Sequence, residues 1–192
     1  MPRNNPETPM RLSVLTTALS LVLVAPALAQ TPPETPASAT AAVSPDVASA
    51  DAILAALYAS ISGDAGVARD WDRFRRLFHP SARLMPAGRD AQGLGRLGVL
   101  TPEDYITRAG PQLEGQGFHE REIARRTDRF GAVTHVFSTY ASRRTADGDV
   151  FARGINSIQL FDDGTRWWIV SVYWQSETPE FPLPAEYLPT SD

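Results

Sequence analysis

The sequence predicts an α+β domain: a cone-like, strongly curved antiparallel sheet with three N-terminal helices packed on its concave face. Helical periodicity comes first along the chain, in segments between residues 50 and 115. The period then changes to that of strands, and three short turns, two with Asp-Gly or Gly-Asp pairs, separate long strand runs as in consecutive hairpins. Strands of about ten residues coil strongly, so helices laid on the concave side of the sheet complete a cone.

Composition limits the chemistry that this domain can carry. The chain has 192 residues, no cysteine, and 18 Lys+Arg, all of them arginine, against 22 Asp+Glu. Disulfides, thiolate metal sites and cysteine nucleophiles are therefore excluded, and the net charge of −4 argues against nucleic-acid binding. The three histidines, at 79, 119 and 135, lack ligand spacing, and no nucleotide-binding fingerprint is present. We expect no metal and no cofactor.

The N-terminus reads as a targeting segment. Residues 1–29 combine early arginines, an apolar run and Ala27-Leu28-Ala29, the pattern of a cleaved signal peptide. A transmembrane anchor is the alternative, but the apolar run is short for a span. Residues 30–49 are rich in Pro, Ala and Thr and predict a disordered linker. The expected location is periplasmic or secreted, without a stable membrane anchor after cleavage.

The helices are expected over 50–61, 70–78 and 101–113. The first has an apolar stripe, the second ends at His79-Pro80, and the third opens with Thr101-Pro102, a capping residue followed by a first-turn proline. A short strand is expected over 82–85, followed by a glycine-rich surface loop over 86–100.

The strands are expected over four ranges, each bounded by a turn. Phe130-Gly131, Ala146 to Asp149, and Asp162-Asp163-Gly164 supply the turns. The strands then fall at 118–129, 132–144, 150–161 and 166–176.

This order of elements resembles the nuclear transport factor 2-like superfamily, including its SnoaL-like domains. The resemblance lies in the Phe74 to Ala82 stretch, in Arg153 to Leu160 and in the ending Asp163 to Val170, which is similar to an Asp-Gly-x-x-Trp-x-Ile last strand. It implies a domain over 50–178 and a pocket between the concave face and the helices. The Pro-rich C-terminal tail over 179–192 departs from the family pattern. The superfamily includes polyketide cyclases, ketosteroid isomerases and secreted proteins of unknown role.

A two-residue turn at Asp163-Gly164 predicts which residues point into that pocket. It pairs Asn156 with Ser171 and Gly154 with Tyr173, and a one-residue bulge reverses the faces. The predicted ligand-pocket residues are Arg121, Tyr140, Asn156, Ser171, Tyr173 and Trp71. The alternative is that these polar groups satisfy one another within a core.

The opposite face of the last strand predicts an interface. Trp168, Val170, Val172 and Trp174 form a broad apolar patch there, which favours a homodimer through the outer sheet face. Glu120 and Glu122 lie among arginines. This pattern favours an exposed ladder of ion pairs over a buried acid or base.

Three functions remain open from the sequence. The first is an exported protein that binds a small apolar or aromatic molecule in a cone-shaped apolar pocket. The second is a small cofactor-independent isomerase, cyclase or dehydratase of the SnoaL-like class that uses a Glu or His as a proton shuttle. The third is a protein–protein interaction module.

Overall fold

The structure is a computed structural model that describes residues 43–189. The predicted signal peptide, most of the predicted linker and the last three residues lie outside the described residues. The fold begins before the expected boundary at residue 50, because a short 3-10 helix, η1 (Pro45–Val47), buries Val47 in the core. Within 43–189, no helix has the length and apolar character needed to cross a membrane.

Three α-helices form, each opened by the side chain of its N-cap residue: α1 (Ala50–Ile61), α2 (Trp71–Leu77) and α3 (Pro102–Gln116). At α3, Thr101 and Asp104 make a reciprocal capping box. The predicted helices are thus confirmed, and α3 extends beyond its expected end at 113.

The sheet has six strands in the order β2-β1-β6-β5-β4-β3. The strands are β1 (Phe78–Arg89), β2 (Gly95–Leu97), β3 (His119–Phe130), β4 (Val133–Arg143), β5 (Val150–Asp162) and β6 (Trp167–Ser176). All neighbours pair antiparallel except β1 and β6, which are parallel. The expected α+β class is confirmed, with a curved sheet that does not close.

The strand expected over 82–85 forms but is longer than expected, and the loop expected over 86–100 is wrong because it contains the end of β1 and all of β2. Parallel pairing with β6 extends β1 to Ala87. Antiparallel pairing with β2, which returns beside β1 as a hairpin, extends it to Arg89. The Asp90 carboxylate accepts hydrogen bonds from the backbone of Gln92 and Leu94, and Gly93 adopts a φ of 76° that closes the turn.

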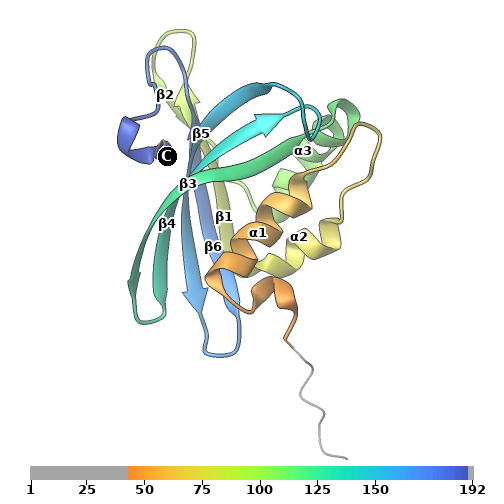
Figure 1. Cartoon of the computed structure of the whole chain (residues 1–192), viewed down its shortest axis with the longest axis vertical. Helices are drawn as coiled ribbons and strands as arrows, with labels where there is room; N and C mark the ends of the chain where they lie inside the picture. Colours follow the sequence, from red (N-terminus) through yellow and green to blue (C-terminus); the bar gives the residue numbers. More distant parts are fainter. Residues whose placement is uncertain (1–42, 190–192) are drawn as a thin grey trace, which may run out of the picture. The chain divides into compact units, whose positions relative to one another are not determined.

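Figure 1 shows α1 and α2 lying across one face of the curved sheet, with α3 toward its upper edge. The core lies between these layers. Its fully buried side chains come from the helices and from the inward residues of the strands, among them Ile53, Leu54, Phe74, Leu77, Val136, Ile158, Leu160 and Ile169. Any cavity that the core side chains do not fill therefore lies between the helices and the inner face of the sheet.

The predicted register between the last two strands is wrong. Asp162 pairs with Trp167, so the turn spans four residues rather than two, and Leu160 pairs with Ile169. A bulge at Val170 then reverses the faces, because Gln159 pairs with Ser171 and Asn156 with Trp174. Beyond the bulge, Val172 and Trp174 point inward, whereas Ser171 and Tyr173 point outward.

The outer face has a covered part and an open part. The C-terminal segment covers one region: the Thr139 hydroxyl donates to the Tyr187 carbonyl at 2.7 Å, and the Tyr187 ring contacts Phe137. The open part is a row of paired residues across four strands, which we call the outer apolar row: Phe130, Val133, Phe161 and Trp168. Phe130 is 89% exposed. A homodimer through this face stays a prediction.

Candidate functional site

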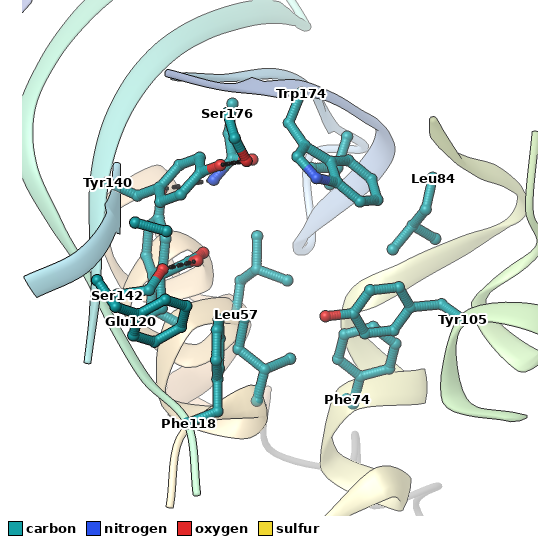
Figure 2. Close-up of a pocket in the computed structure, with 16 residues that line it drawn as sticks. Leu57, Phe74, Leu84, Tyr105, Phe118, Glu120, Tyr140, Ser142, Trp174 and Ser176 are labelled. Atoms are coloured by element: carbon teal, nitrogen blue, oxygen red, sulfur yellow. Dashed lines mark hydrogen bonds between the residues drawn. The ribbon is translucent and has the colours of Figure 1, made fainter. Parts of the chain in front are cut away.

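A cavity of about 230 Å³ lies between the helices and the inner face of the sheet. Its walls are mostly apolar and aromatic (Figure 2). The helices contribute Leu57, Tyr58, Ile61, Phe74 and Tyr105; the sheet and the residue before β3 contribute Leu84, Phe118, Glu120, Tyr140, Ser142, Phe151, Ala152, Asn156, Val172, Trp174 and Ser176. Phe151 and Ser176 are exposed, so the cavity opens on their side.

The carboxyl group of Glu120 lies in this cavity. Strand β3 directs Glu120 inward opposite Ser142, whose hydroxyl donates to Glu120 Oε2 at 2.7 Å. Burial raises the pKa of Glu120 to about 7, although hydrogen bonds from Ser142 and Asn156 act in the opposite direction. The exposed ion-pair ladder expected here is therefore wrong for Glu120. Both protonation states of this group are populated near neutral pH.

Glu122, two residues along β3, also points inward but does not line this cavity. Its carboxylate pairs with Arg125 at 2.6 Å and accepts a hydrogen bond from Ser138. Arg125 in turn pairs with Asp51 at 2.6 Å. The ion-pair expectation holds here in part, since this cluster reaches the surface through Arg125 and Asp51.

Two tyrosines bring hydroxyl groups to the cavity from opposite sides. Figure 2 shows the Tyr105 hydroxyl directed into the cavity from α3. In the described part of the chain no side chain or backbone group forms a hydrogen bond with it, and burial raises its pKa above the ordinary value. The Tyr140 hydroxyl lies 3.0 Å from Ser176 Oγ, and burial raises its pKa to about 12.

Gly154 makes room for the Tyr140 ring. A Cβ at Gly154 would collide with the Tyr140 ring and with the Gln175 carbonyl. Because Gly154 lies directly opposite Tyr140 in the ladder, the ring lies flat across β5 and its hydroxyl reaches Ser176 on β6. A residue with a side chain at 154 would force the ring out of this position.

Of the predicted ligand-pocket residues, the structure brings Tyr140 and Asn156 to the cavity. Ser171 and Tyr173 lie on the outer face because of the bulge at Val170, and Tyr173 is 46% exposed.

Arg121 and Trp71 also lie away from the cavity. Arg121 is exposed because its inward neighbours on β3 are Glu120 and Glu122. Trp71 instead joins α2 to α3: its indole N–H donates to Glu114 Oε1 at 2.9 Å.

Sequence reasoning missed Glu120, Tyr105 and Trp174. Trp174 points into the cavity because of the bulge at Val170, and no residue type in β6 predicts that bulge. Tyr105 had a signal, because it is the only aromatic residue of the predicted third helix and lies on its apolar side with Ile106 and Ala109.

The histidines do not converge on a metal site. Each has a separate partner: His79 Nδ1 contacts Ser81 at 2.7 Å, His119 Nε2 contacts Asp64 at 2.8 Å, and His135 Nε2 contacts Ser157 at 2.9 Å. Across residues 43–189, no three His, Cys, Asp or Glu residues cluster in a way that suits a metal ion.

No protein-family model and no curated protein matches the chain. Solved structures do. A protein of unknown function with a cystatin-like fold from Nostoc punctiforme is 12% identical, with a TM-score of 0.50, over 71% of this chain and 98% of that chain. An NTF2-like protein of unknown function from Methylobacillus flagellatus is 16% identical, with a TM-score of 0.44, over 68% and 95%.

A "putative ketosteroid isomerase" from Parabacteroides distasonis is 14% identical, with a TM-score of 0.44, over 68% of this chain and 89% of that chain. At such identities a likeness of coordinates establishes fold alone. The chain thus has the cystatin-like fold of the Nostoc punctiforme protein, and an NTF2-like protein and a putative ketosteroid isomerase are among its structural neighbours.

Proposed function

We propose that this domain binds one small, largely apolar molecule in the inner cavity. The supporting observation is an aromatic and aliphatic cavity that holds the Glu120 carboxyl group and the Tyr105 hydroxyl, which has no hydrogen-bond partner among residues 43–189. Removing polar groups from water without partners costs free energy. A ligand that pairs with them offsets that cost, and apolar pockets with few polar groups are typical ligand sites.

The protein works outside the cytoplasm in this proposal, in the periplasm or after secretion. That part rests on the signal-peptide pattern of residues 1–29 alone.

Two neighbouring residues of β6 provide a sharp binding test. Val172 is buried and lines the cavity, whereas Tyr173 lies on the outer face. We expect indan-1-ol, a compact aromatic alcohol, to shift the NMR methyl signals of Leu57, Leu84 and Val172. The Val172→Phe substitution fills the cavity and abolishes these shifts, and Tyr173→Phe leaves them unchanged. Shifts confined to surface methyl groups, or unaltered binding by Val172→Phe, would contradict the proposal.

A second candidate function is cofactor-independent acid–base chemistry of the isomerase, cyclase or dehydratase type. The observation that favours it is the Glu120 pKa of about 7, because a group near the working pH both accepts and returns a proton. Glu120 would take a proton from a carbon next to a ligand carbonyl, and the Tyr105 hydroxyl would donate to the developing enolate oxygen.

Proton exchange tests this candidate directly. We expect the protein to accelerate deuterium incorporation from D₂O into the CH₂ groups of indan-2-one, followed by NMR. Glu120→Gln should abolish the acceleration and Tyr173→Phe should preserve it. Exchange at the uncatalysed rate with the wild-type protein would leave the domain as a binding protein.

A further inference from the structure

A chain of four hydrogen-bonded side chains crosses the core from the Glu122–Arg125 ion pair to the cavity. Its members are, in order, Glu122, Ser138, Tyr58 and Asn156. We infer that this chain fixes the Asn156 amide with its oxygen toward the cavity, so that the ligand carries a hydroxyl or N–H donor at that end. The inference rests on the proposed function, and it names the class of ligand and the residues that select it.

The Glu122 end of this hydrogen-bonded chain determines which group donates in each of its hydrogen bonds. The Glu122 carboxylate pairs with Arg125 at 2.6 Å and therefore acts as an acceptor. The Ser138 hydroxyl donates its proton to Glu122. A serine hydroxyl has one proton, so Ser138 Oγ can only accept from Tyr58 Oη, which lies 2.6 Å away.

Counting the protons available for donation also assigns the hydrogen bonds between Tyr58 and the cavity. Tyr58 uses its single proton on Ser138, so its oxygen accepts from Asn156 Nδ2 at 3.1 Å. The assignment of nitrogen and oxygen in this amide thus follows from the network. Asn156 also lowers the pKa of Glu120 through a hydrogen bond, which requires that the same nitrogen donates to the carboxyl group.

The amide oxygen is left for the ligand. Asn156 is 6% exposed, and over residues 43–189 no donor reaches its Oδ1. Thr134 Oγ1 is the one fully enclosed side-chain polar atom there without a partner. Asn156 Oδ1 therefore keeps accessible surface, and the surface that Asn156 lines is the cavity. A ligand with only acceptors at this end leaves the oxygen without a partner.

The test compares two probes of one skeleton, indan-1-ol and indan-1-one, at about pH 8.5, where Glu120 is mostly ionised. We expect the wild-type protein to bind the alcohol about tenfold or more tightly, the range for a buried acceptor left unpaired. Equal affinities would overturn the inference while leaving the proposed function standing.

Ser138→Ala tests the chain without touching the ligand, because Ser138 is fully buried and does not line the cavity. Tyr58 then donates to Asn156 Oδ1, the amide turns, and the preference for the alcohol falls to about onefold or reverses. The matched control is Thr134→Val on the same face of β4, which removes a hydroxyl that has no partner. The control should keep the wild-type preference, and an unchanged preference in Ser138→Ala would overturn the inference.

A ligand-free measurement separates this inference from the proposed function. We expect nuclear Overhauser contacts between the Asn156 side-chain amide protons and the Tyr58 ring protons in the wild-type protein. Their absence would overturn the inference, whether or not the probes bind. If the contacts are present and neither probe binds, the orientation of Asn156 is supported and the proposed function fails.

Discussion

The carboxyl group of Glu120 makes the stability of the domain depend on pH in an unusual direction. Its pKa rises from 4.5 to about 7 on folding because the cavity removes it from water. Between these values the folded state binds more protons than the unfolded state, so the free energy of unfolding falls as pH rises. Each unit corresponds to about 1.4 kcal/mol, which gives a loss of about 3 kcal/mol as an upper limit.

The Glu120→Gln substitution keeps the acceptor for Ser142 and removes the titration. Urea unfolding followed by tryptophan fluorescence, from about pH 4.5 to about pH 8, measures both proteins. The wild-type protein should lose up to about 3 kcal/mol relative to Glu120→Gln across this window. Carboxyl groups whose pKa is lowered by folding, such as Asp163, stabilise the folded state throughout this pH range. Their contribution to the free energy of unfolding is lost only at lower pH, so they do not obscure the comparison.

A matched control is Glu180→Gln, which removes an exposed carboxyl group of the C-terminal segment. It should follow the wild-type profile. Parallel profiles for the wild-type protein and Glu120→Gln would refute the claim that the cavity desolvates Glu120.

Further substitutions test the framework of the cavity. Gly154→Ala should cost about 1–3 kcal/mol of stability in urea unfolding, because the new methyl group overlaps the Tyr140 ring; a neutral effect would contradict the close approach. Arg69 donates to carbonyl groups at the ends of α1 and α3, including Ile61 and Leu113. Arg69→Met should therefore lower stability by about 3 kcal/mol in thermal unfolding, and a loss below about 1 kcal/mol would count against this role. The predicted homodimer should dissociate in Phe130→Ser, measured by light scattering; a monomeric wild-type protein would refute the prediction.

Element order was predictable because the hydrophobic period differs between helices and strands. The apolar stripe of 50–61 and the capping pair Thr101-Pro102 correspond to α1 and α3. The length of the first strand was underestimated because it pairs with the last strand of the chain. Local sequence does not report such a long-range parallel pairing.

The site was harder to predict because it depends on register. One extra residue, Val170, exchanges the faces of β6 and moves Tyr173 out and Trp174 in. Tyr140 and Asn156 were found because the β4–β5 ladder keeps their predicted common face.

Glu120 was missed for a different reason. Alternating charges along 119–126 are typical of an exposed strand. Its burial comes from helices that are distant in sequence, which wrap over this end of the sheet and shield the inward carboxyl groups. The residue pattern within one strand does not predict burial by helices that are distant in sequence.

The most direct measurement of the central claim is a crystal structure of the protein purified from its native cells. We predict electron density for one small, flat or compact molecule between Glu120 and Tyr105, with a donor group at Asn156 Oδ1. A cavity filled by the protein's own side chains, or a molecule bound only on the outer sheet face, would contradict the account.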